Sequence, residues 1–237
     1  MHTGLFFPYS WHLDDEETEV TSIRIYGINE HKKNICLRID NFTPFVYLEL
    51  PKNIPWSVSK AQLVVNKINE ILGNQRPLSC SLQWKYKLYG VYLDETGNRK
   101  KFPYLFCSFS NKGDIKNLTY KLKNSQHIVG LGSLKLKIHE SDADPILQLT
   151  CCREIPTAGW IKFHGKAVEE LEKLTICDEE YKVKWKNVSP VENCEHVARP
   201  KIMGFDIEVN STNPSAMPKA EKVGDKIFQI SCVLAIE

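Results

Sequence analysis

The sequence lacks the short motifs by which many enzymes can be recognised. It has no G-x-S-x-G, Walker A or G-x-G-x-x-G sequence, and the closely spaced Gly130 and Gly132 fit a turn. Its eight cysteines include no C-x-x-C pair, and its seven histidines are scattered without the spacing of a metal site. We therefore predict no zinc site and no nucleotide-binding loop. No cysteine has an assigned base that would make it a nucleophile.

Long apolar runs and a strong net charge are absent too. No uncharged stretch approaches the length of a membrane span, and the sequence opens with no secretory signal pattern. Scattered cysteines in such a chain favour free thiols in a reducing compartment. The formal net charge is +2, which neither indicates nor excludes a local basic patch for nucleic acid.

The sequence does contain enough apolar residues for a core, since 42% of its 237 residues are hydrophobic, and its length predicts one or two domains. Alternation predicts a β-hairpin over 23–26 and 35–39. From residue 45 the periodicity predicts strand, helix, strand, strand, helix and strand, over 45–50, 55–73, 82–93, 102–109, 114–123 and 134–138. This order is the split βαβ pattern of a ferredoxin-like or RRM-like layer over 45–138. The predicted fold class is therefore α+β, mixed and strand-rich.

An RRM-like layer raises the question of nucleic-acid binding. Alternation places Phe102, Tyr104 and Phe106 on one face of a strand, where such layers stack single-stranded bases. The segment lacks the glycine of an RRM strand and carries Pro103. Core or interdomain packing of the three rings is the alternative interpretation.

A second candidate contact lies near the end of the strand-rich region. Three lysines alternate with Val183 and Trp185 and share one strand face: Lys182, Lys184 and Lys186. That face could contact phosphates. The alternative is that the lysines form the solvated side of an ordinary strand.

A short, largely apolar run over 202–209 carries two acids, Asp206 and Glu208. Strand side chains repeat every second residue, so both carboxylates leave the same face. Two carboxylates at so short a distance repel each other and favour a cation between them. Carboxylate oxygens are ligands that suit a hard ion such as Mg²⁺. Two-metal phosphoryl chemistry uses carboxylates in this way. Two solvated acids on an edge strand are the alternative, because the spacing is short and common.

A polar loop and a second apolar run, 225–235, follow these acids. The order is Phe205-Asp206-Ile207-Glu208, a loop, and then Gln229-Ile230-Ser231. This segment resembles the opening of the 3′–5′ exonuclease domain of family B DNA polymerases. The resemblance implies that Asp206 and Glu208 are metal-ligating acids of that domain. It also implies that 196–237 supplies the first two strands of an RNase H-like fold.

Upstream segments resemble the N-terminal domain of the same family, in matching order. They are Tyr26-Gly27-Ile28-Asn29, Phe42-Thr43-Pro44-Phe45-Val46-Tyr47, Glu140-Ser141-Asp142 and Gly159-Trp160-Ile161. In that family a Glu-Ser-Asn-like turn precedes a strand, which would lie here at 146–150. The resemblance thus assigns 1–195 to a polymerase N-terminal domain. The polar stretch 192–200 is then the boundary to a truncated exonuclease domain at 196–237.

The resemblance implies an N-terminal part of a longer DNA-directed DNA polymerase. Such a parent extends primers and excises mismatched 3′ ends with two Mg²⁺ ions. Its implied partners are primer–template DNA and the remaining polymerase domains, with a processivity factor as a further candidate and no membrane. Frequent Lys, Asn and Ile suit a large DNA virus or an AT-rich eukaryote. We then expect an intracellular protein, in the nucleus or in a cytoplasmic viral factory.

The chain alone is expected to be catalytically silent, because half a metal site binds metal weakly and the polymerase palm is absent. Its own role would be a scaffold that supports the exonuclease domain and guides template. Two alternatives remain open. One is a single-stranded nucleic-acid-binding module built on 45–138, and the other is an RNase H-like nuclease with an N-terminal adaptor.

Overall fold

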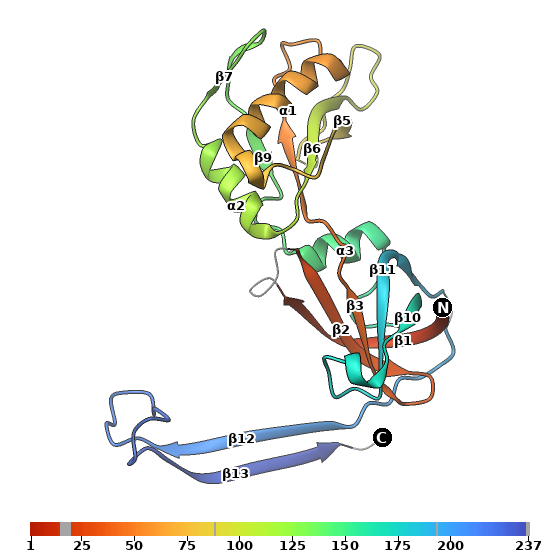
Figure 1. Cartoon of the computed structure of the whole chain (residues 1–237), viewed down its shortest axis with the longest axis vertical. Coiled ribbons are helices and arrows are strands. Elements are labelled where there is room, and N and C mark those ends of the chain that lie inside the picture. Colours follow the sequence, from red (N-terminus) through yellow and green to blue (C-terminus); the bar gives the residue numbers. More distant parts are fainter. Residues whose placement is uncertain (15–19, 88, 193, 236–237) are drawn as a thin grey trace.

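The structure is a computed structural model that describes residues 1–14, 20–87, 89–192 and 194–235. Over these residues the fold is α+β and strand-rich, as predicted. The ribbon has three parts (Figure 1). A closed barrel lies in the middle, a four-stranded sheet with two helices lies at one end, and a long two-stranded hairpin lies at the other.

The barrel joins strands from both ends of the first 190 residues. Its strands close in the order β1-β10-β11-β3-β2, with β3 and β11 parallel and the other neighbours antiparallel. The predicted hairpin forms β2 and β3, and its inward residues Ile23, Ile25 and Leu37 are fully buried. The barrel elements are β1 (His2–Asp14), β2 (Ser22–Asn29), β3 (Asn34–Ile39), β10 (Ile161–Ala167), the 3-10 turn η2 (Glu170–Glu172) and β11 (Glu179–Pro190).

Gly27 in β2 leaves no room for a side chain against β1. It pairs with Pro8, and a Cβ atom built on it would collide with the Phe7 carbonyl oxygen and lie 2.6 Å from the Phe6 ring. A backbone oxygen cannot move aside without separating the two strands, so glycine is needed here.

Replacing Gly27 with alanine is therefore expected to lower the free energy of unfolding of the barrel by about 3 kcal/mol. Urea denaturation followed by circular dichroism measures the change. The matched control is Gly204→Ala, because Gly204 also lies in a strand but has no atom within 4 Å of an added Cβ. Equal stability of the two variants would contradict this account of β1 and β2.

The prediction of a strand at 146–150 is wrong, because these residues lie in helix α3 (Pro145–Arg153). Asp144 caps the helix by accepting a hydrogen bond from the Ile146 amide at 2.7 Å, and Pro145 occupies the first turn. Both are helix-start signals. A short apolar run does not distinguish a strand from a buried helix, and these start signals decide in favour of the helix.

The four-stranded sheet has the order β5-β6-β4-β9, and all of its neighbours are antiparallel. Helices α1 and α2 cover one face, where Val46, Leu48, Leu105 and Cys107 are buried in a shared core. The other face, here called the helix-free face, is covered by neither α1 nor α2, and its Tyr47 and Phe106 pack toward the barrel core. The elements are β4 (Phe45–Glu49), α1 (Val58–Leu72), η1 (Gly73–Gln75), β5 (Ser79–Tyr86), β6 (Lys101–Ser108), α2 (Lys112–Lys121), β7 (Gln126–Ile128), β8 (Gly132–Leu134) and β9 (Lys137–His139).

The element order predicted from residue 45 onward is present, with shifted boundaries. The strand predicted over 82–93 starts earlier and ends at Tyr86, and the strand predicted over 134–138 is divided between β8 and β9. Helix α1 begins after Ser57, whose hydroxyl accepts a hydrogen bond from the Lys60 amide at 3.3 Å. The N-terminal cap of the helix is therefore Ser57.

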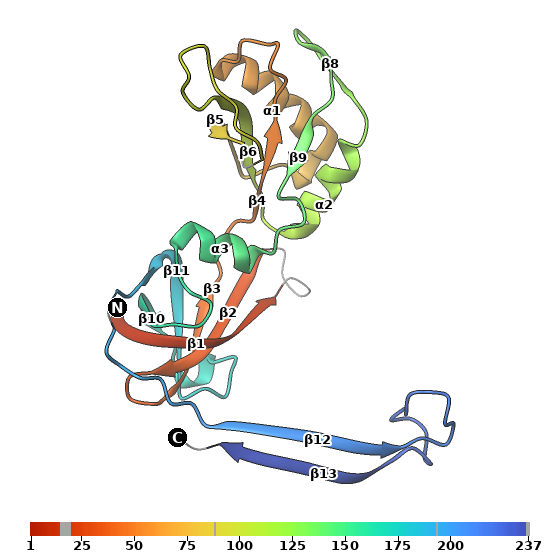
Figure 2. The same ribbon diagram turned by 180° about the vertical axis from the view of Figure 1, so that it is seen from behind.

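The hairpin at the far end consists of β12 (Ile202–Asn210) and β13 (Lys226–Ala235). It extends away from the barrel as a long two-stranded ribbon (Figure 2). Within the part of the chain that the structure describes, no helix is both long and apolar enough to cross a membrane.

Candidate metal-binding carboxylates and nucleic-acid contacts

Asp206 and Glu208 lie in the middle of β12, on one face of the hairpin. In the antiparallel pairing with β13, Asp206 lies opposite Ser231 and Glu208 lies opposite Gln229. The register is regular between the two acids and shifts only after Glu208. Strand alternation therefore directs both carboxylates to the same side, beside Ser231 and Gln229.

The opposite face of the hairpin is apolar and uncovered. Its side chains come from both strands and are all exposed: Met203, Phe205, Ile207, Ile230, Cys232 and Leu234. An isolated pair of strands is marginally stable in water, and an exposed apolar face of this kind marks an interface. The face that carries the acids is thus backed by a face that requires a packing partner.

The two carboxylates fit a hard divalent cation in kind, since Mg²⁺ prefers oxygen ligands and is often held by only one or two carboxylates together with substrate phosphates. Among the described residues, no group of three or more His, Cys, Asp or Glu side chains could hold a metal. Asp206 also accepts a hydrogen bond from the Ile207 amide at 2.9 Å. The described part of the hairpin therefore brings two carboxylates, Asp206 and Glu208, to one face.

The loop that joins β12 to β13 is organised by Asp225. Its carboxylate accepts hydrogen bonds from the Thr212 amide at 2.7 Å, the Thr212 hydroxyl at 2.7 Å and the Lys219 amide at 2.9 Å. Hydrogen bonds to the charged form lower the pKa of Asp225 to about 2. The Asp225 carboxylate is thus engaged in hydrogen bonds within the loop. The acids of the exposed strand face are Asp206 and Glu208.

We expect the loop to lose its order as the pH falls from about 4 to about 2. The folded-state pKa is depressed, so the contribution of Asp225 is present above its ordinary pKa of 3.8 and disappears as the pH falls to the folded value. An NMR titration of the Asp225 carboxyl carbon, with amide exchange at Thr212 and Lys219, measures both effects. Asp225→Ala should speed that exchange at neutral pH, whereas Glu221→Ala should not. A carboxyl that titrates near 4 would contradict the hydrogen-bond pattern.

The three aromatic candidates share the helix-free face of the sheet, but they are largely covered. Phe102 is 2% exposed and Tyr104 is 7% exposed. Phe106 is half-buried against Phe45, at a ring-centroid distance of 5.2 Å, where the sheet meets the barrel core. Phe102 and Phe106 therefore lack a free ring face for stacking. Tyr104 lies at the floor of a hollow.

The three lysine candidates are exposed on one face of β11, while Val183 on the other face is buried. Lys182 and Lys184 line a shallow hollow of about 370 Å³ together with Arg38. Lys186 lies beyond it, with its ammonium 5.4 Å from the Trp185 ring centroid. The structure thus brings two of the three lysines to one hollow.

The structure also reveals a cluster that sequence reasoning missed. Glu49 from β4, Lys87 just beyond β5 and His139 from β9 meet on the helix-free face. Lys87 Nζ and His139 Nε2 contact the Glu49 carboxylate, the latter at 3.1 Å. Burial alone would raise the pKa of Glu49, but these hydrogen bonds outweigh it and lower that pKa, and the same contact raises the pKa of Lys87. No local pattern links residues so far apart in sequence.

Comparison with known proteins finds a matching family model and similar viral proteins. Residues 136–237 match the family model described as DNA polymerase family B, exonuclease domain. The chain is 41% identical to DNA polymerase 037L of Invertebrate iridescent virus 6, over 97% of this chain and 20% of that protein. It is 38% identical to DNA polymerase 120R of Invertebrate iridescent virus 3, over 96% of this chain and 21% of that protein. The chain therefore spans about a fifth of the length of these relatives.

A solved structure has a similar fold. The family B DNA polymerase from the archaeon Pyrobaculum calidifontis aligns with 98% of this chain and 25% of its own, at a TM-score of 0.65. The sequence identity is 16%, so this likeness concerns the fold alone.

Proposed function

Because the chain is related to the family B DNA polymerases, we propose that Asp206 and Glu208 are the first two carboxylates of a 3′–5′ exonuclease metal site. The observation that carries this proposal is the geometry of the hairpin. Both acids share one face of β12, and the opposite face is an apolar surface of the kind that a larger domain covers. We assign the hairpin as the first two strands of an RNase H-like sheet.

In a protein of the relatives' length, these carboxylates would hold Mg²⁺ over the end of a DNA strand. When bound there, two such ions supply an activated water and neutralise the leaving 3′ oxygen. The contribution of this chain is to fix two ligands two residues apart on a strand, so that their separation is set by the backbone. The other ligands would come from later segments, from the substrate and from water.

For that full-length protein we propose a DNA-directed DNA polymerase with proofreading. Its partners would be primer–template DNA and the polymerase domains that follow, with a processivity factor as a further candidate. It would act inside the cell during replication of viral DNA, in the nucleus or in a viral factory. The names of the relatives support the polymerase assignment and specify neither partner nor compartment.

Within this scheme, the first 195 residues would form an N-terminal scaffold. The strand order β9-β4-β6-β5, with both helices on one face, supports a ferredoxin-like assignment for 45–139. Together with the barrel, this layer would support the exonuclease domain and guide the template. The alternative of an RNase H-like nuclease with an N-terminal adaptor predicts no primer extension by the full-length protein.

The test uses the full-length protein. Asp206→Ala and Glu208→Ala should each lower Mg²⁺-dependent cleavage of single-stranded DNA by on the order of a hundred- to a thousandfold while primer extension continues. Glu221→Ala, which removes an exposed acid from the adjoining loop, is the matched control. Undiminished cleavage in both strand variants would refute the assignment. The 237-residue chain alone should show no cleavage that depends on Asp206.

A further inference from the structure

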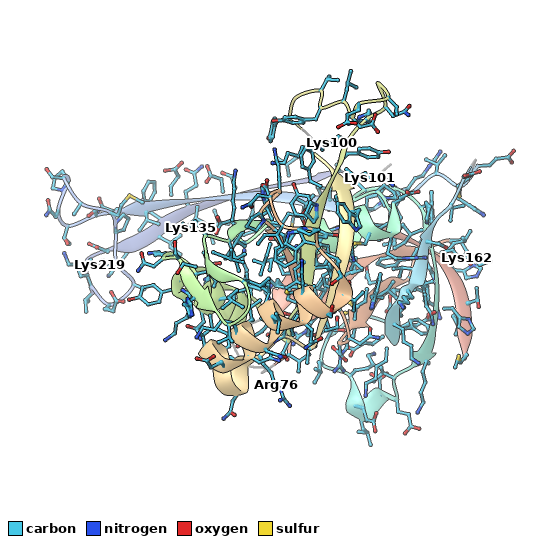
Figure 3. All side chains as sticks on the ribbon, turned by 90° about the horizontal axis from the view of Figure 1, so that it is seen from above. Arg76, Lys100, Lys101, Lys135, Lys162 and Lys219 are labelled. Atoms are coloured by element: carbon cyan, nitrogen blue, oxygen red, sulfur yellow. The ribbon has the colours of Figure 1, made fainter. Side chains whose placement is uncertain are left out.

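The chain between β5 and β6 forms an exposed arm, here defined as residues 87 and 89–100. It projects from the sheet, with Lys100 and Lys101 at its base (Figure 3). Asp94 closes the tip by accepting hydrogen bonds from the Thr96 and Asn98 amides, both at 3.0 Å. The strand-like pairing of Leu93 with Arg99 continues this turn. The arm is thus a preformed turn.

Three tyrosines on and beside this arm present accessible rings. Tyr86 is 48% exposed, Tyr89 is 84% exposed and Tyr92 is 42% exposed. Tyr92 packs edge-on against Phe102 at 5.2 Å between centroids. Tyr86 lies beneath the Arg99 guanidinium at 4.8 Å. Exposed aromatic rings are costly in water and are characteristic of binding surfaces, so this concentration calls for a ligand with flat apolar faces.

Cations alternate with these rings. Residues 85–101 contain five cations, Lys85, Lys87, Arg99, Lys100 and Lys101, against two anions, Asp94 and Glu95. Lys85 and Lys137 also line the hollow of about 650 Å³ beside the arm, over Tyr47 and Tyr104. The lining holds two acids: Glu49, which is already paired with Lys87 and His139, and the exposed Glu140, against Lys85, Lys87 and Lys137. The surface therefore offers positive charge to an anionic ligand.

We propose that the arm and this hollow bind single-stranded DNA. Unpaired bases would stack on Tyr86, Tyr89 and Tyr92, and phosphates would contact lysines of the arm base and of the hollow. Rings interleaved with cations suit a single strand, because stacking requires bases with a free face and a duplex hides those faces. The identity of the nucleic acid as DNA rests on the proposed function. The site itself involves neither Asp206 nor Glu208.

Fluorescence anisotropy with the 237-residue chain and a labelled oligo(dT) tests this proposal. Binding should weaken as salt rises, and Tyr89→Ala should weaken it by about tenfold, the typical loss for one stacked base. Lys100→Glu with Lys101→Glu should weaken it further and flatten the salt dependence. The matched controls are Tyr120→Ala and Lys123→Glu, which change an exposed tyrosine and its neighbouring lysine on the opposite, helical face.

Several results would overturn the proposal. They are undiminished binding by Tyr89→Ala, an equal loss in the Tyr120 control, or equal affinity for a duplex of the same length. A clear preference for oligo(rU) would assign the surface to RNA and refute the DNA assignment. Tyr89 is 84% exposed, so its loss should not unfold the chain, and the circular dichroism spectrum of the variant checks this. Nuclease loss in Asp206→Ala is measured separately, so either proposal can fail while the other stands.

Discussion

Arg38→Ala is expected to lower the free energy of unfolding of the barrel by about 3–5 kcal/mol, because it leaves a buried carboxylate without its cation. The Glu180 side chain has no exposed surface, and Arg38 Nη1 lies 3.0 Å from its Oε1. The other oxygen of Glu180 accepts hydrogen bonds from the Leu174 amide and the Thr175 hydroxyl, both at 3.0 Å. Arg38 thus neutralises a carboxylate that ties the loop before β11 to the barrel.

Urea denaturation compares three variants. Arg38→Ala alone should be strongly destabilised, and adding Glu180→Gln should restore part of the stability, since the uncompensated charge is then gone. Lys33→Ala removes the ammonium that lies 2.7 Å from the neighbouring Glu179, but that lysine side chain is 54% exposed, so we expect little change. A loss for Arg38→Ala no greater than for Lys33→Ala would show that Glu180 does not depend on its partner.

Local sequence accounts well for the hairpin β2–β3 and for helix α1. Ile23 and Ile25 alternate into the barrel core, and Val64, Ile68 and Leu72 form the buried stripe of the helix. Both patterns follow from the period of a single element. The closure of the barrel was not predicted, because it depends on β1 pairing with β10 and on the parallel contact of β3 with β11. Such pairings join residues more than a hundred positions apart and leave no periodic signal.

For the candidate site, too, the period of a single strand predicts some features and not others. That Asp206 and Glu208 share a face follows from alternation alone. Alternation also places Phe102, Tyr104 and Phe106 on one face, but it cannot tell that this face is covered by Tyr92 and by the barrel. Alternation does not predict the exposed tyrosines of the arm, because it extends the strand to residue 93, whereas β5 ends at Tyr86. Which ring faces solvent is decided by tertiary packing, which a single-element pattern does not contain.

Gln148→Leu is expected to loosen the junction between the barrel and the sheet. The amide of Gln148 donates to the Phe45 carbonyl at 2.8 Å and accepts from the Phe45 amide at 3.2 Å, both in buried surroundings. The Phe109 amide donates to the Pro44 carbonyl, so in an antiparallel ladder Phe45 turns its own groups away from β6. On that side β9 pairs only with residues 47–49. Gln148 therefore takes the place of a missing strand neighbour.

Leucine keeps the volume of Gln148 but leaves two buried backbone groups unsatisfied, at a cost of about 2–5 kcal/mol. Amide hydrogen exchange across β4, together with urea denaturation, measures the loss. Gln148→Glu should lose at least as much stability at neutral pH, because an ionised carboxylate would be buried without a cation against the Phe45 carbonyl and cannot donate to it. Gln62→Leu is the control, since that exposed side chain on α1 bonds Asn66 at 2.9 Å on the surface. If the β4 amides are equally protected from exchange in Gln148→Leu and in Gln62→Leu, then water or another group must form the hydrogen bonds to the Phe45 backbone.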